Sequence, residues 1–579
     1  MHGRITIAYI ALVKICLYLL SLCCVYAQTD SVIVKRDTLS VQEENLKTVH
    51  SYDEISLTRS YGGEHRSSFV SATSILPHQV NVEFNGFKLN DHFSSVFTST
   101  RLQKKRWAIS SLSGHSFKFR SDTSAYIKPL THFILADGDF SSTYVESTYQ
   151  QSISKHSKLI LGFHNFEPNA PIASAFSGNR RETQVFAEYS KEEDIYAYHL
   201  TYMFYRNVMN DYGYDILAYD QSTYFSESRV QNQLILTGRF NQFLFGFRNS
   251  VQNRDWEDIT ISKPYKSWIH EGHIYYKYFP HQFGIKVQSH VANSAGYTAK
   301  WNRLSLGTHY MYHSEKLRGS IEFFPFVQTD NISDESPVFN ISADYTDSDV
   351  SVQINAESKM PLINQSVFVK DSSKFSVLDE YSLPIRANTA LENEYILSGN
   401  FEYSYHKNHA LKLYASSVLN PIEYKRSELM FLNSKSRADI LISSINNLSF
   451  QVLVDMNLQF KNTFGLYQSN SFLPKFSSEV HLFSAFHLIG DCDIRLSATG
   501  RFDGKRKLLY YSRYTGMYSV SDLEKNQQFS GAISIDFIIK KAVLSFKIGN
   551  LFQPNISNVY GYTETSLGSW FSLDWTFND

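Results

Sequence analysis

The run His270-Glu271-Gly272-His273 is the arrangement in this chain that comes nearest to a metal site. It is one residue shorter than the His-Glu-x-x-His pattern, in which a helix places two histidines on one face to bind zinc. Residues three apart on a strand point to opposite faces, so these two histidines would diverge there. Nucleophile-elbow and phosphate-loop patterns are absent from the sequence as well. We therefore predict no catalytic residues, no metal and no cofactor, and the chain is not expected to be an enzyme.

The composition excludes several other classes of protein. Phe 43, Tyr 38 and Trp 6 make 15% of the 579 residues aromatic, while Gly 26 and Pro 13 are few, which argues against a disordered or collagen-like chain. The formal net charge of −1 lacks the basic surface that nucleic-acid binding needs, so no nucleic-acid partner is expected.

The first residues have the pattern of a secretory signal peptide. Arg4 and Lys14 supply positive charge, an apolar run follows, and Val25-Tyr26-Ala27 ends it at a small residue, so residues 1–27 are predicted to be cleaved. Three of the four cysteines lie in this segment, and Cys492 is the only one beyond it. The exported chain therefore cannot form an internal disulfide and needs another source of stability, which a closed barrel in lipid provides.

From about residue 128 to 579 one pattern repeats. Segments of about ten residues alternate apolar and polar positions between short polar turns, which is typical of transmembrane β-strands. In one of them Leu200 and Tyr202 share a face while Thr201 and Met203 share the other, and Asn241-Gln242 and Lys540-Lys541 are expected hairpin turns. Residues 167–180, 207–229 and 359–390 are expected to be loops.

The pattern predicts an all-β fold, an outer-membrane β-barrel of about 16–22 antiparallel strands that contacts outer-membrane lipid. A soluble all-β protein is the alternative, because its strands alternate too. Aromatic residues near the strand ends favour the membrane, where they form interfacial girdles. The expected location is thus the outer membrane of a Gram-negative bacterium.

The segment 48–127 resembles the plug domain of TonB-dependent receptors. The resemblance is carried by Gly62-Gly63 and by residues 82–91, where a strand runs into Asn85-Gly86 and a polar pair, Asn90-Asp91, follows. The segment is shorter than a full plug, which implies a small or truncated plug-like domain inside the barrel.

Two further segments are similar to the same family. Residues 546–552 and Gly561-Tyr562 precede a closing strand with Phe571, Leu573, Trp575 and Phe577 on one face, which resembles the signal read by the barrel-assembly machinery. Within the leader of residues 28–47, Asp37-Thr38-Leu39-Ser40-Val41 resembles the TonB box, a segment that adds a strand to the energising TonB system.

The resemblance implies an outer-membrane transport protein that moves a small solute, whose identity the sequence does not give. Two alternatives stay open at this point. One is a passive porin-like channel, and the other is a barrel-anchored surface protein or enzyme.

Overall fold

The computed structural model describes the chain in separate stretches. They are residues 81–84, 87–88, 107–113, 116–121, 129–138, 142–167, 179–214, 222–258, 262–294, 300–329, 338–359, 394–405, 409–419, 422–425, 428–431, 436–451, 455–467, 474–512, 517–549, 551–552 and 568–578. The predicted signal peptide, the leader and the TonB-box-like segment 37–41 lie outside the described residues. Among the described residues, no helix is long and apolar enough to cross a membrane.

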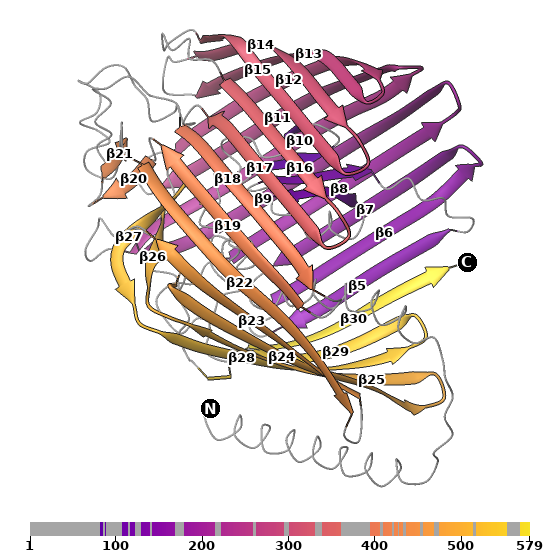
Figure 1. The fold of residues 1–579 in the computed structure, drawn as a ribbon, viewed down its shortest axis with the longest axis vertical. Helices are drawn as coiled ribbons and strands as arrows, with labels where there is room; N and C mark the ends of the chain where they lie inside the picture. The colour runs from indigo at the N-terminus through magenta and orange to yellow at the C-terminus, as the bar shows by residue number, and fades with distance from the viewer. Residues whose placement is uncertain are drawn as a thin grey trace.

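The largest element is a closed barrel of 22 strands, each antiparallel to its neighbours (Figure 1). The predicted all-β barrel is therefore confirmed, with a strand number at the top of the expected range. The barrel strands are β5 (Leu130–Gly138), β6 (Ser142–Ser154), β7 (Ser157–Glu167), β8 (Asn179–Glu192), β9 (Tyr196–Tyr214), β10 (Ser222–Phe240), β11 (Phe243–Asp258), β12 (Ser262–Tyr278), β13 (His281–Ser294), β14 (Lys300–His313), β15 (Leu317–Thr329), β16 (Val338–Thr346), β17 (Val350–Lys359), β18 (Glu394–Tyr405), β19 (His409–Leu419), β22 (Ser436–Gln451), β23 (Asp455–Tyr467), β24 (Phe476–Ile489), β25 (Cys492–Asp503), β28 (Gln528–Ile539), β29 (Ala542–Gly549) and β30 (Gly568–Asn578).

The last strand closes the ring on the first. β30 pairs with β5, for example at Leu573 and Leu135, so neither strand is left as an open edge. Two small hairpins lie outside the ring, β20 (Ile422–Lys425) with β21 (Glu428–Phe431) and β26 (Arg506–Ser512) with β27 (Met517–Lys525). A separate four-stranded sheet has the order β2-β1-β4-β3 and contains β1 (Asn81–Phe84), β2 (Phe87–Lys88), β3 (Trp107–Ser113) and β4 (Ser116–Ser121).

Short turns join the strands at one end of the barrel. The predicted turns at Asn241-Gln242 and Lys540-Lys541 are confirmed, and Asn241 and Lys540 have φ of 51° and 53°. A two-residue hairpin requires this left-handed conformation, because it matches the twist of the flanking strands. The expected loop at residues 207–229 is wrong for most of its length, since β9 continues to Tyr214 and β10 starts at Ser222.

The reason for that error is strand length. β9 and β10 have 19 residues each, against the roughly 9–11 that cross a bilayer. Paired strands that continue past the membrane keep their backbone hydrogen bonds, so a polar sequence there does not imply a loop. Residues 168–178 and 360–390, inside the other two expected loops, lie outside the described residues.

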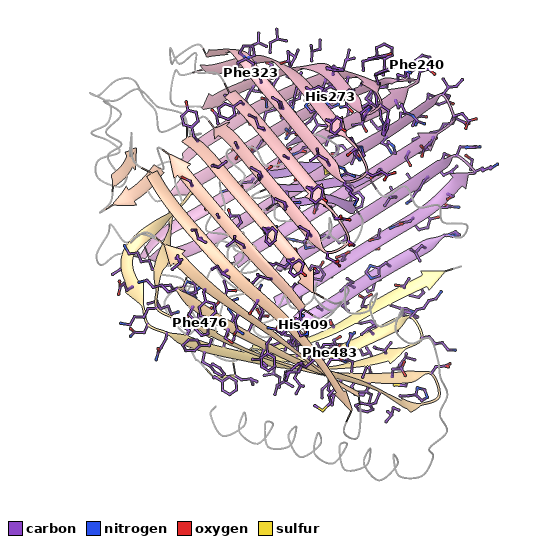
Figure 2. The ribbon with its side chains drawn as sticks, viewed as in Figure 1. Phe240, His273, Phe323, His409, Phe476 and Phe483 are labelled. Carbon is purple, nitrogen blue, oxygen red and sulfur yellow. The ribbon has the colours of Figure 1, made fainter. Side chains whose placement is uncertain are left out.

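Side-chain exposure separates the two faces of the barrel wall. On β9, Leu200 and Tyr202 are 40% and 41% exposed, whereas Thr201 and Met203 are each 1% exposed. The predicted alternation is confirmed, and the large exposed side chains of the other strands follow it, as Figure 2 shows for Phe240 and Phe323 at the outer surface. The apolar face is the outer one, as expected of a wall in contact with lipid.

Candidate functional site

The candidate site is the inner wall of the barrel where the small sheet contacts it. The indigo strands lie within the barrel in Figure 1, and Phe87 of β2 is completely buried. Its ring lies 4.8 Å from the ring of His273 on β12, between ring centroids. Gly246 of β11 lies directly opposite His273, and an added Cβ there would approach the Phe87 ring to 2.8 Å. Glycine at this position therefore allows the phenyl ring to reach the wall.

The local sequence explains why Phe87 projects there. β1 and β2 pair antiparallel, with Phe84 opposite Phe87, and two residues separate these strands in the sequence. Those residues are the predicted motif residues Asn85 and Gly86, which lie outside the described residues, as do Asn90 and Asp91. The aromatic residue that follows the motif is the one that touches the barrel.

From Phe87, a chain of ring contacts continues along the inner wall, one of them stacked and the others tilted. The His273 ring is 4.4 Å from the Tyr275 ring, with 12° between their planes, and the Tyr275 ring is 4.7 Å from that of His309 on β14. His309 Nδ1 lies 3.4 Å from a carboxylate oxygen of Glu322 on β15. We call Phe87, His273, Tyr275 and His309 the aromatic ladder. It connects the small sheet to two barrel strands, β12 and β14.

A buried ion pair lies beside the ladder. Arg248 Nη1 donates a hydrogen bond of 3.1 Å to Glu271 on the neighbouring strand, and the two side chains are 1% and 2% exposed. Removing two charges from water is costly unless they compensate each other, so this pairing is required wherever the wall is dry. Lys286 Nζ lies 3.7 Å from Glu322 Oε1, which places a second pair next to His309.

Further polar contacts on the inner wall join β25 to β28 and β30 to β5. Arg495 donates from Nε and Nη2 to Asp536 Oδ2, at 2.9 and 2.8 Å. A short contact of 2.6 Å joins His132 Nε2 on β5 to Asp574 Oδ1 on β30. The inner wall is therefore polar over widely separated strands, which suits hydrated solutes rather than apolar ones.

Strand geometry decides which way the side chains of residues 270–273 on β12 point. His270 is exposed on the outer face, whereas Glu271 and His273 are buried on the inner face, so the predicted divergence of the two histidines is confirmed. Within the stretches that the structure describes, no group of three or more His, Cys, Asp or Glu side chains could hold a metal ion.

The residues of the predicted assembly signal lie on β30 and take no part in the aromatic ladder. Phe571 and Trp575 are 40% and 43% exposed on the outer face of β30, while Ser572 and Asp574 face inward. Their role in assembly stays a prediction, as does that of Leu573 and Phe577. Sequence reasoning missed Phe87, Arg248 and the ladder, because the partners of these residues are identified only by strand register.

The fold defines a class of protein, a closed 22-stranded antiparallel β-barrel with a small sheet against its inner wall. Solved structures of this class are similar to the chain. They include the siderophore receptor PirA from Acinetobacter baumannii, at 9% identity and a TM-score of 0.58, with 86% of this chain and 91% of that chain covered. The siderophore receptor PirA from Pseudomonas aeruginosa has 8% identity and a TM-score of 0.57, with 88% of this chain and 96% of that chain covered.

A third similar structure is a mutant of the ferric enterobactin receptor PfeA from Pseudomonas aeruginosa in complex with enterobactin. It has 10% identity and a TM-score of 0.57, and 86% of this chain and 92% of that chain are covered. No protein-family model matches the chain, and no curated protein sequence matches it. At this identity the likeness establishes the shared fold.

Proposed function

We propose that the chain is an outer-membrane transport protein of the TonB-dependent receptor type, which moves a small solute across the outer membrane of a Gram-negative bacterium. The observation that carries the proposal is Phe87, a residue of the plug-like segment that is fully buried against the inner wall of a closed barrel. A barrel that serves only as an anchor has no need for a separate folded sheet in contact with its lumen. Transport is accordingly preferred to catalysis.

The faces of the wall support the proposed location. Outer positions carry Leu, Phe and Tyr, while inner positions carry ion pairs such as Arg248 with Glu271. This is the inverse of a soluble protein, and it has the lower free energy only when lipid surrounds the barrel. The shared fold supports the same location, because the similar structures are siderophore receptors.

The energising partner is proposed from the leader. Residues 37–41 would add a strand to the TonB protein, with main-chain hydrogen bonds giving the affinity. The short-turn end of the barrel, where β30 ends and β5 begins, would then face the periplasm. The plug-like segment 48–127 joins that leader to the barrel in sequence, so a pull on the leader would act on the sheet that holds Phe87.

The test is the affinity of the purified full-length protein for the soluble domain of TonB, measured by titration calorimetry. Leu39→Pro should abolish binding, because proline removes a main-chain donor from the added strand. Glu44→Pro is the matched control, since it introduces the same residue into the same leader outside the segment. Binding that survives Leu39→Pro, or that both variants weaken equally, would refute the TonB-box assignment.

A further inference from the structure

Two rows of inner-wall residues differ sharply in their contact with solvent. The first row crosses β8, β9, β10, β11 and β12 through directly paired residues, and each member is at most 2% exposed. We call it the buried row; its members are Glu188, Thr201, Ile235, Arg248 and Glu271.

The second row crosses β18, β19, β22, β23, β24 and β25, again through directly paired residues. We call it the polar row; its members are Glu402, Lys412, Ser443, Thr463, Ser477 and Asp503. All six point inward, because the residues beside them on each strand, such as Phe464 at 54% exposed, face outward. Glu402 and Lys412 form an ion pair of 2.9 Å, yet they are 31% and 38% exposed.

The contrast lies between different parts of the same barrel, because β18 and β19 come seven places after β11 and β12 in the ring. In strand order β24 comes eleven places after β11 in the ring of 22, so the two strands face each other across the lumen. The ion pair on β11 and β12 is dry, whereas that on β18 and β19 is wet, although both point inward. Next to the polar row, the paired residues Lys461, Glu479 and Arg501 are also partly exposed.

The polar row connects the two ends of the barrel. Glu402 lies three residues before the end of β18 at the short-turn end, and Asp503 is the last residue of β25 at the opposite end. Five strand spacings of about 4.8 Å make the row roughly 24 Å long. Because barrel strands tilt by about 35–45°, a row across them also climbs roughly 15 Å along the axis. The members from Glu402 to Ser477 are partly exposed, whereas Asp503 is only 7% exposed. The partly exposed side chains thus follow an oblique line from near the short-turn end to Ser477, the second residue of β24 at the opposite end.

We infer that the polar row lines a water-filled path that stays open to water, small ions and small polar solutes without an energising partner. The path is separate from the aromatic ladder, whose barrel strands β12 and β14 lie at least four places from β18 in the ring. Acids and bases are matched along it, since Glu402 pairs with Lys412 and Arg501 Nε donates to Asp503 at 3.1 Å. The local field is therefore nearly balanced, and the path should pass cations and anions with little preference. This inference rests on the proposed function only in taking the barrel to span a membrane.

The experiment uses the full-length protein with Cys492→Ser, which removes the single cysteine beyond the predicted signal peptide. Thr463→Cys places a thiol on the polar row, and Thr201→Cys places one on the buried row by the same substitution. Each variant is treated with a trimethylammonium methanethiosulfonate, which does not cross lipid. Thr463→Cys should react roughly ten times faster or more, because a buried thiol reacts only after local opening. Ser443→Cys replaces Thr463→Cys if the latter fails to assemble, as judged by heat-modifiable gel mobility.

The same variants are then recorded in planar lipid bilayers without any partner protein. The untreated protein should conduct steadily in potassium chloride, and the current through Thr463→Cys should fall after the reagent is added, with no change for Thr201→Cys. A sealed barrel, equal reaction rates, or a current insensitive to modification of the polar row would each overturn the inference. A sealed barrel that still binds TonB would refute the path alone, whereas conduction without TonB binding would refute only the energised function.

Discussion

Two inner-wall ion pairs, Arg248 with Glu271 and Lys412 with Glu402, give a quantitative test of how dry their surroundings are. At 3.1 Å and an effective dielectric constant of about 20, the attraction between Arg248 and Glu271 is about 5 kcal/mol. At 2.9 Å in a water-like medium, that between Lys412 and Glu402 is about 1 kcal/mol. Arg248→Met leaves a buried carboxylate without this partner and should cost about 3–5 kcal/mol of unfolding free energy. Lys412→Met should cost about 1 kcal/mol or less.

The assay is urea unfolding of the barrel in detergent micelles, followed by tryptophan fluorescence and by heat-modifiable gel mobility. The double variants Arg248→Met with Glu271→Met and Lys412→Met with Glu402→Met complete two thermodynamic cycles. The first double variant should recover most of the loss, since it removes the unpaired buried charge. Equal losses for the two single variants would refute the reasoning that the first ion pair is dry and the second is wet.

Three other perturbations have definite expected outcomes. Phe87→Ala should weaken the docking of the small sheet by about 3–5 kcal/mol, seen as faster hydrogen exchange in β1 and β2 while barrel amides stay unchanged. A hydrogen bond from the Lys316 ammonium, 3.0 Å long, lowers the pKa of Asp347 below its usual value. The wild type should therefore exceed Asp347→Asn in thermal stability at neutral pH and lose that advantage as pH falls through the lowered pKa; a constant difference would contradict this. Trp575→Ser should reduce the folded barrel recovered from outer membranes, whereas Ser572→Ala, on the inner face of the same strand, should not.

Much of the fold could be predicted from the sequence because a strand in lipid must alternate. Leu200 and Tyr202 against Thr201 and Met203 indicate which side chains face lipid. Turns such as Asn241-Gln242 are equally readable, since their residues tolerate the left-handed conformation. The same local rules mislead where paired strands leave the membrane, as at residues 207–229, because polar sequence and loop are no longer equivalent there.

The sequence by itself determined that this is an all-β barrel chain, which faces of its strands are apolar, and where the closing strand lies. Only the tertiary structure decided which inner residues meet. Arg248 and Glu271 are 23 residues apart in sequence and pair through register alone, and Phe87 finds Gly246 and His273 by folding inside the ring. Nor can alternation distinguish Thr201 from Thr463, since both are inward polar residues on amphipathic strands. Which of them is dry depends on what packs against it across the lumen, and that is a property of the assembled barrel.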